Sequence, residues 1–202
     1  MILLKVLAGL LYVMVGGWGY FRSRARYIDD EKFCRPVFAA LLCSMAGDVL
    51  LALEHKRGMI FVLGVACFSA AHMLFSLAFC RASVVTWVDF AGTMAVFGGL
   101  LSLLLLGRFS YHGLLPVLIG YAALISFMTV KALSLWRCRR KWGRAAVLVM
   151  CGGVLFLLSD IVLLFWMFGK GMPRGVQYAN LLLYYLAQGC LAGSLWQNSR
   201  KI

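Results

Sequence analysis

Ionisable side chains inside long apolar runs are the residues of this sequence best able to do chemistry. Asp48, Asp89, Asp160 and His72 all stand among mostly aliphatic and aromatic neighbours. An ionised side chain at the centre of a membrane helix costs roughly 2.5 to 3.5 kcal/mol on insertion scales, so such residues usually face a polar interior and mark a functional site. These four residues are therefore the first candidates for a site.

Asp48 and Asp160 are predicted to lie at the same depth. Each comes six residues before the outer end of its apolar run, at Glu54 and Trp166, and a helix rises 1.5 Å per residue, which places both carboxyls roughly 9 Å below the outer boundary. Two buried carboxyls at one level suit one to act as a general acid and the other as a base. Asp89 lies near the inner end of its run, where a structural role is expected.

Further polar residues recur at helical spacing around these groups, so that each set shares one helix face. The sets are Ser44 and Asp48; Ser69, His72 and Ser76; and Gln177, Asn180, Tyr184 and Gln188. Lipid offers no hydrogen-bond partners, so these faces are expected to surround one interior polar cavity, lined by the second, third, sixth and seventh apolar runs. The alternative, strongest for the serines and open for His72, is interhelical hydrogen bonding worth about 0.6 kcal/mol per group.

The elements that carry these residues are membrane helices. Of the 202 residues, 63% are hydrophobic, and the mean hydropathy of +0.91 excludes an ordinary soluble globule. A spanning helix needs about 20 mostly apolar residues. The sequence predicts one all-α transmembrane domain over residues 1–202, with about seven spans at residues 2–20, 36–53, 59–79, 84–106, 113–130, 145–168 and 176–196.

The net charge of +13 does not indicate a nucleic-acid partner, because the 20 Lys and Arg residues form short clusters between the apolar runs. In a seven-span chain, 14 of these cations fall on one side and six, Lys5 among them, on the other. The positive-inside rule then places the N-terminus outside and the C-terminus in the cytoplasm. A chance asymmetry is the alternative. A short chain without extensions is expected in a bacterial cytoplasmic membrane.

Metal and disulfide chemistry are not expected. The seven cysteines lie in or beside spans or on the predicted cytoplasmic side, and none forms a CxxC pair. One buried histidine and two separate aspartates make a thin ligand set for a metal, so no metal and no cofactor is predicted.

Five segments together resemble a known family. They are RPVFAALLCSMAGDVLLAL, FVLGVACFSAAHMLF, LLPVLIGYAALISFM, GGVLFLLSDIVLLF and LLLYYLAQGCLAGS. Four of them carry Asp48, His72, Asp160 and the run from Tyr184 to Gln188. In order and spacing the sequence is similar to the lysoplasmalogenase (YhhN-like) family of integral membrane hydrolases, from about Arg35 to Ser194. Members of that family are often drawn with eight spans, so the resemblance allows for an eighth.

The resemblance implies hydrolysis of the vinyl-ether bond of a lysophospholipid, lysoplasmalogen, to a fatty aldehyde and glycerophosphoethanolamine or glycerophosphocholine. That chemistry needs a positioned acid, an anion to stabilise an oxocarbenium-like cation, and a base for water. Asp48 and Asp160 are the predicted catalytic residues, in either order. The predicted substrate-binding residues are His72, Tyr184, Tyr185 and Gln188. Membrane lipid surrounds the protein, and the oligomeric state is left open.

Two other functions compete with the hydrolase. A small proton- or cation-coupled transporter would use the same buried carboxylates, and the GDVLLAL and SDIVLLF segments do echo each other weakly. A non-catalytic assembly protein is the third interpretation. It predicts that replacing Asp48 with Asn leaves the activity of the membrane intact.

Overall fold

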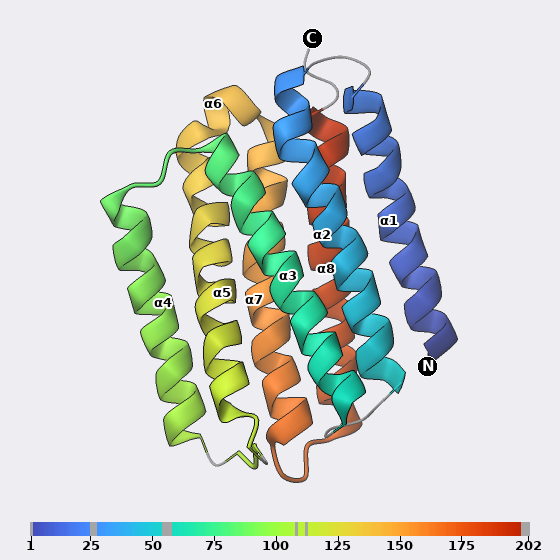
Figure 1. Ribbon diagram of the computed structural model, residues 1–202, viewed down its shortest axis with the longest axis vertical. Coiled ribbons are helices and arrows are strands. Elements are labelled where there is room, and N and C mark those ends of the chain that lie inside the picture. The colour runs from blue at the N-terminus through green and yellow to red at the C-terminus, as the bar shows by residue number, and fades with distance from the viewer. Residues whose placement is uncertain (1, 25–27, 54–57, 108, 112, 199–202) are drawn as a thin grey trace.

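Helices make up the regular structure of the computed structural model, which describes residues 2–24, 28–53, 58–107, 109–111 and 113–198 (Figure 1). The long helices are α1 (Ile2–Arg24), α2 (Ile28–Leu53), α3 (Met59–Ala82), α4 (Trp87–Leu106), α5 (Leu115–Ser134), α7 (Arg144–Phe168) and α8 (Arg174–Asn198). A 3₁₀ turn, η1 (Leu135–Cys138), and a single helical turn, α6 (Arg139–Trp142), connect α5 to α7. The predicted all-α bundle is confirmed.

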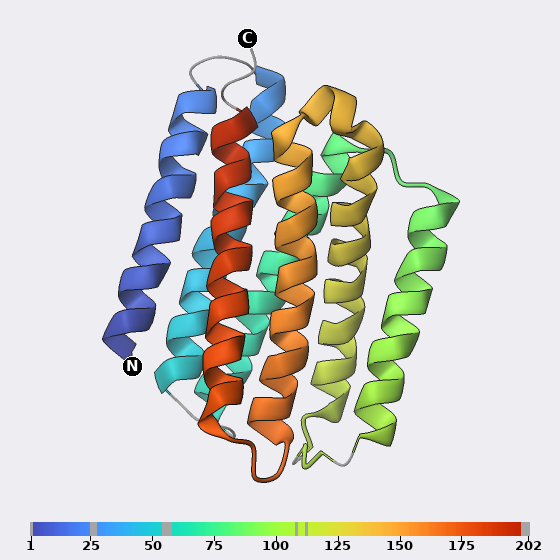
Figure 2. The same cartoon turned by 180° about the vertical axis from the view of Figure 1, so that it is seen from behind.

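Successive long helices run in opposite directions, and all but α3 and α4 pack side by side with the next (Figures 1 and 2). The most extensive pairs are α7 with α8 and α2 with α3, and α1 packs on both α2 and α8. Helix α5 packs on α3, α4 and α7. Helices α1 and α4 lie at opposite edges of the bundle, and α4 packs principally on α5.

Six of the described helices, α1 to α5 and α7, are long and apolar enough to cross a membrane. Helix α8 has 25 residues but contains the polar face predicted for the last span, which lowers its mean hydropathy. Asn180 and Gln188 of that face are buried, so their side chains face neighbouring helices. A helix with a buried polar face satisfies the requirement that lipid contact only apolar groups.

The predicted spans fall inside these helices, with two differences at their starts. The fourth begins at Trp87 instead of residue 84, because Ser83 and Thr86 are extended and Thr86 caps the helix. The fifth begins at Leu115 instead of residue 113, after Gly113 with a φ of +86°. Several helices also continue past their apolar runs, since backbone hydrogen bonds persist where charged side chains reach the interface.

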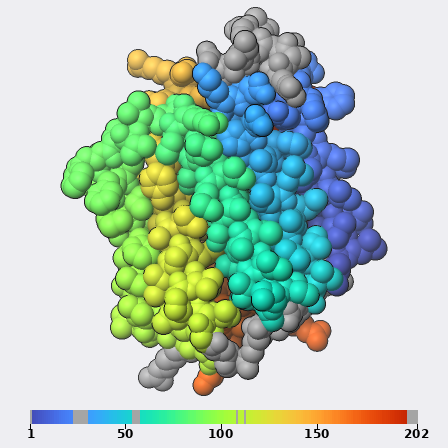
Figure 3. Space-filling view, in the orientation of Figure 1, coloured from blue at the N-terminus to red at the C-terminus, as the bar shows by residue number. Residues whose placement is uncertain are grey.

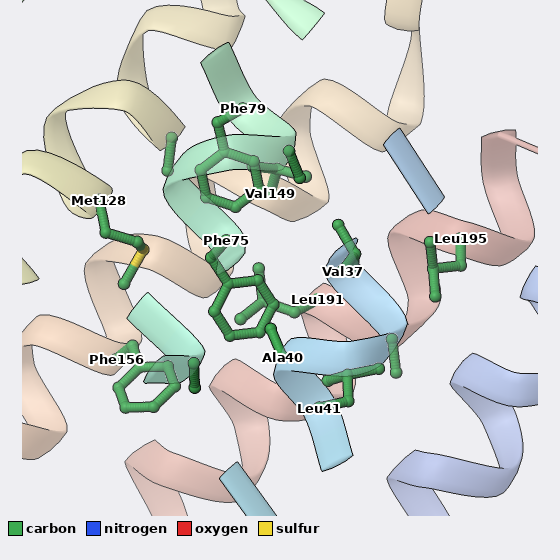
Figure 4. Packing of buried hydrophobic residues seen from close by; sticks show 14 of the residues in the cluster. Val37, Ala40, Leu41, Phe75, Phe79, Met128, Val149, Phe156, Leu191 and Leu195 are labelled. Carbon is green, nitrogen blue, oxygen red and sulfur yellow. The ribbon is translucent and has the colours of Figure 1, made fainter. Parts of the chain in front are cut away.

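The core lies where α2, α3, α5, α7 and α8 meet (Figure 4). Phe75 and Phe156 are fully buried there, beside Leu191 of α8. The helices approach each other closely in this core: a Cβ added to Gly47 would lie 2.8 Å from the Phe68 ring. Such close packing stabilises a membrane bundle, because lipid gives helices no hydrophobic reason to associate.

Candidate active site

Asp160 is held by a tyrosine that the sequence did not single out. The hydroxyl of Tyr121, on α5, donates to Oδ2 of Asp160, on α7, at 2.5 Å. Nε2 of His72, on α3, lies 2.8 Å from the same hydroxyl oxygen and 3.6 Å from Asp160 Oδ2. Three helices thus contribute to one hydrogen-bonded group, which we call the Asp160 cluster.

The direction of these bonds determines the histidine tautomer. A phenol has one hydrogen, and Tyr121 gives it to Asp160, so His72 Nε2 must donate to the phenol oxygen. A neutral His72 therefore carries its hydrogen on Nε2, and its Nδ1 is an acceptor. The ring is fully buried and packs edge-on against Phe156, with the centroids 4.8 Å apart. This packing fixes the plane in which Tyr121 can approach.

The Asp160 cluster borders an apolar cavity. The cavity has a volume of about 90 Å³ and is lined by side chains of α2, α3, α4, α5 and α7. Asp160 and Tyr121 are the polar residues among those lining it, and the others are aliphatic or phenylalanine and methionine side chains. A carboxyl group at the wall of an apolar cavity is placed to act on a bond within a hydrocarbon substrate.

Asp48 lies in a second group, the Asp48 cluster, at the α1, α2 and α8 junction. Lys5 Nζ donates to Asp48 Oδ1 at 2.7 Å, and the Tyr185 hydroxyl donates to Oδ2 at 2.8 Å. The Lys5 and Asp48 side chains are only 15% and 10% exposed. Both carboxylate oxygens are therefore engaged, and the aspartate is part of an ion pair.

Aromatic rings lie between the two clusters. Tyr184 packs edge-on against Phe68 and Phe156, with centroid distances of 5.9 and 5.7 Å. Its hydroxyl donates to the Ser44 carbonyl at 3.1 Å and lies 3.2 Å from the hydroxyl of Tyr12. The predicted single polar cavity between four spans is therefore wrong: the polar groups divide into two clusters separated by aromatic packing.

Helices α1 and α5 contribute residues that the sequence reasoning left out. Tyr121 was missed because a neutral phenol in an apolar run costs little and gives no signal, although it lies on a helix that also carries Ser126. Lys5 was counted as an outer charge but lies within α1, in the ion pair with Asp48. The signal that could have identified Lys5 is a lone lysine in an otherwise apolar run.

Three predicted polar residues have side-chain atoms without a protein partner in the described part of the chain. These atoms are Ser44 Oγ, His72 Nδ1 and both polar atoms of Gln188, and all three residues are fully buried. An unsatisfied buried polar group costs roughly 1 to 3 kcal/mol. A native fold usually keeps such a group for a function that needs it.

Other polar residues do hold the helices together, as the structural alternative proposed. Asn180 Nδ2 donates to the Ser159 carbonyl at 2.9 Å, which joins α8 to α7. Asp89 accepts from the Thr86 backbone N–H at 2.9 Å, from Lys131 at 3.2 Å and from Arg137. The expected structural role of Asp89 agrees with these contacts. Within the residues described, no group of three or more His, Cys, Asp or Glu side chains is arranged to hold a metal ion.

Comparison with known proteins gives this arrangement a family. Residues 3–195 match the model of the YhhN family. The chain belongs to the YhhN family. Every residue of the Asp48 and Asp160 clusters lies within the residues matched by the family model.

A curated relative of this YhhN protein is "Lysoplasmalogenase TMEM86B" of Sus scrofa, which is 32% identical over 166 residues, or 80% of the chain. The chain spans 63% of the length of that relative. No solved structure matches this YhhN chain.

Proposed function

We propose that this YhhN-family protein is a membrane-embedded lysoplasmalogenase, which hydrolyses the vinyl-ether bond of lysoplasmalogens. The observation that carries the proposal is Asp160, a carboxyl anchored by Tyr121 at the wall of an apolar cavity. A vinyl ether is an apolar functional group at the head of a hydrocarbon chain, and its cleavage begins with an acid. The name of the relative and the family support the same activity.

In the proposed reaction Asp160 is the general acid. Its proton goes to the β-carbon of the vinyl ether, and the electron pair of the double bond forms the new C–H bond. The ether oxygen shares the resulting positive charge, which the Asp160 carboxylate stabilises at close range. Water then adds to the α-carbon and returns a proton to the carboxylate. The hemiacetal so formed breaks the C–O bond to glycerol, and its hydroxyl proton passes to the departing glycerol oxygen, which releases the aldehyde and the glycerophospho-alcohol.

Tyr121 and His72 position this acid. With Oδ2 held by the Tyr121 hydroxyl, Oδ1 is the oxygen left to face a substrate. His72 fixes the phenol through Nε2 and offers Nδ1 to water or to a substrate hydroxyl. Gln188 and Tyr184 are proposed to bind the polar part of the substrate, with Gln188 providing both a donor and an acceptor.

Asp48, predicted as the second catalytic carboxylate, is proposed to add negative charge from the far side of Tyr184, while Asp160 carries out the acid and base steps. The contact with Lys5 suits a carboxylate that stabilises positive charge and does not suit an acid. Tyr185 orients it through Oδ2. The structure thus favours one order of the pair that the sequence left open, with Asp160 as the acid.

We also propose the orientation with the N-terminus outside and the C-terminus in the cytoplasm, in a bacterial cytoplasmic membrane. Lys5 and Lys131 lie inside helices in ion pairs, so neither reports on a loop. Removing one cation from each side of the count leaves the asymmetry in place. In this orientation the apolar cavity lies in the outer half of the membrane.

The test is aldehyde release by the purified protein in detergent. Lysoplasmalogen is the substrate, and a lysophospholipid with a saturated alkyl ether is the matched control. We expect aldehyde from the vinyl ether and none from the saturated ether. No release by protein that is folded, as judged by a cooperative thermal transition, would contradict the hydrolase and favour a transporter.

A further inference from the structure

A groove on the lipid-facing side of the bundle leads to the Asp160 cluster. Helix α4 packs principally on α5 and stands away from α3, so that side chains of α5 form the surface between α3 and α4 (Figure 3). Side chains from the helices on both sides of this groove also line the apolar cavity. They include Leu100 and Leu104 of α4, Phe61 and Val65 of α3, and Ile125 of α5.

The cavity extends from the outer end of the bundle to the acid. Phe168, the last residue of α7, lines one end, and Asp160 lies eight residues earlier. At 1.5 Å per residue these two positions are about 12 Å apart along the helix. A chain in the cavity would therefore run alongside α7 with one end at the carboxyl.

The volume suits one hydrocarbon chain. An engineered cavity of roughly 150 Å³ binds benzene, and this one has about 90 Å³, which is room for a few carbons of a single chain and not for two chains side by side. Among the described residues that line it, the side chains with hydrogen-bonding groups are those of Asp160 and Tyr121. An apolar chain that carries one reactive polar atom is the matching occupant.

Helix α4 is held mainly by α5. Asp89, in its first turn, is held by Lys131 of α5 at 3.2 Å, and Leu104, near its other end, is 4% exposed. Helices α3 and α4 are not among the closely packed pairs of the described chain. Direct packing of α4 on α3 therefore does not close the groove between them.

We propose that the groove between α3 and α4 is a lateral entrance, which takes the hydrocarbon chain of a single-chain lipid directly from the bilayer and seats it beside Asp160. The proposal rests on the proposed hydrolase function, because it assigns the chain of that substrate to this cavity. Access from the bilayer, instead of from water, follows from the apolar walls. A chain held here brings its first carbons to the acid.

The test measures binding without reaction. The probe is a set of saturated alkyl-ether lysophospholipids of 2 to 10 chain carbons, which lack the bond to be cleaved, added to the protein in nanodiscs. Leu104→Trp fills the cavity, because Leu104 is 4% exposed and lines it. Leu105→Trp is the matched control, since the next residue is 58% exposed and faces lipid. Leu100→Phe is a second, smaller filling variant, and thermal unfolding checks that each variant folds.

Each methylene excluded from the cavity should weaken binding about fourfold. We expect Leu104→Trp and Leu100→Phe to raise the Kd of the 10-carbon probe about tenfold, and to reduce the gain in affinity with chain length. Leu105→Trp should match the parent. Equal chain-length dependence in the parent and in both folded filling variants would overturn the proposal. Because the probe is not cleaved, its binding is measured independently of hydrolysis. A protein without hydrolase activity would therefore still test this proposal.

Discussion

The Tyr121 hydroxyl donates to Asp160 Oδ2 across 2.5 Å, from α5 to α7. The same oxygen of Tyr121 receives the Nε2 hydrogen of His72, from α3. One side chain therefore connects three helices and engages one of the two carboxyl oxygens of Asp160, which lines the apolar cavity. The accuracy with which Asp160 can deliver a proton depends on this connection, since misplaced catalytic groups lose rate steeply.

Tyr121→Phe should lower kcat about 10- to 100-fold, because Asp160 loses the hydrogen bond that orients it. The ring still fills its place, so thermal stability should change little. The measurement is kcat for aldehyde release alongside thermal unfolding. Tyr178→Phe serves as the control, as Tyr178 is 60% exposed on α8. An unchanged kcat in Tyr121→Phe would remove the tyrosine from the site.

Lys5 and Asp48 should be energetically coupled. Removing one partner leaves the other charge poorly solvated, so Lys5→Met and Asp48→Asn should each destabilise the protein, and the double variant should cost less than their sum. The expected coupling is about 1 to 3 kcal/mol. Thermal or denaturant unfolding of the three variants measures it. Additive effects would mean that the 2.7 Å contact contributes nothing to stability.

Lys131 is a structural residue in this account. Its ammonium is fully buried and donates to the Ser83 carbonyl, the Ser83 hydroxyl, the Val84 carbonyl and Asp89. Lys131→Met should cost about 3 to 5 kcal/mol of stability, because it leaves Asp89 buried with one cation fewer. Arg137→Gln should cost less, since the Arg137 side chain is 42% exposed. Activity per folded molecule should be unchanged in both, and a Lys131→Met variant as stable as the parent would contradict the assignment.

A substitution of Gln188 should lower activity without lowering stability, the opposite of the result expected for Lys131→Met. The Gln188 amide has no protein partner in the described part of the chain, so Gln188→Leu removes a buried polar cost and should leave stability unchanged or raise it by about 1 kcal/mol. Aldehyde release should fall, because the proposed contact with the substrate is lost. Asn180→Leu is the matched control on the same helix: Asn180 donates to the Ser159 carbonyl and hydroxyl, so its loss should cost about 1 to 3 kcal/mol. Lower stability in Gln188→Leu with full activity would argue for a structural role.

The sequence predicted which helix faces are polar but not which faces meet. Asp160 and His72 were expected in one cavity and do lie together, 3.6 Å apart, although the sequence placed His72 deeper and did not pair the two. Asp48 was expected in the same cavity, yet it pairs with Lys5 on the far side of Tyr184 and its aromatic neighbours. Helical periodicity fixes a direction on each helix, whereas the rotation of one helix against another depends on packing, such as the fit of Phe68 against Gly47.

The span boundaries show a related limit. Hydropathy located the apolar runs, but the helix starts at Trp87 and Leu115 depend on local features, a Thr86 cap and the backbone conformation of Gly113. The low hydropathy of α8 has a different cause. Its polar face is buried inside the bundle, so a helix that completes the fold looks less like a membrane span than its neighbours do.

The most direct test of the central claim is the rate of aldehyde release from lysoplasmalogen by the parent and by Asp160→Asn, each in H₂O and in D₂O. If Asp160 protonates carbon in the slow step, the parent will be slower in D₂O. The kcat of Asp160→Asn should then fall by about 10² to 10⁴, while its thermal stability stays close to that of the parent. An Asp160→Asn protein with the kcat of the parent would contradict the claim that this carboxyl is the acid.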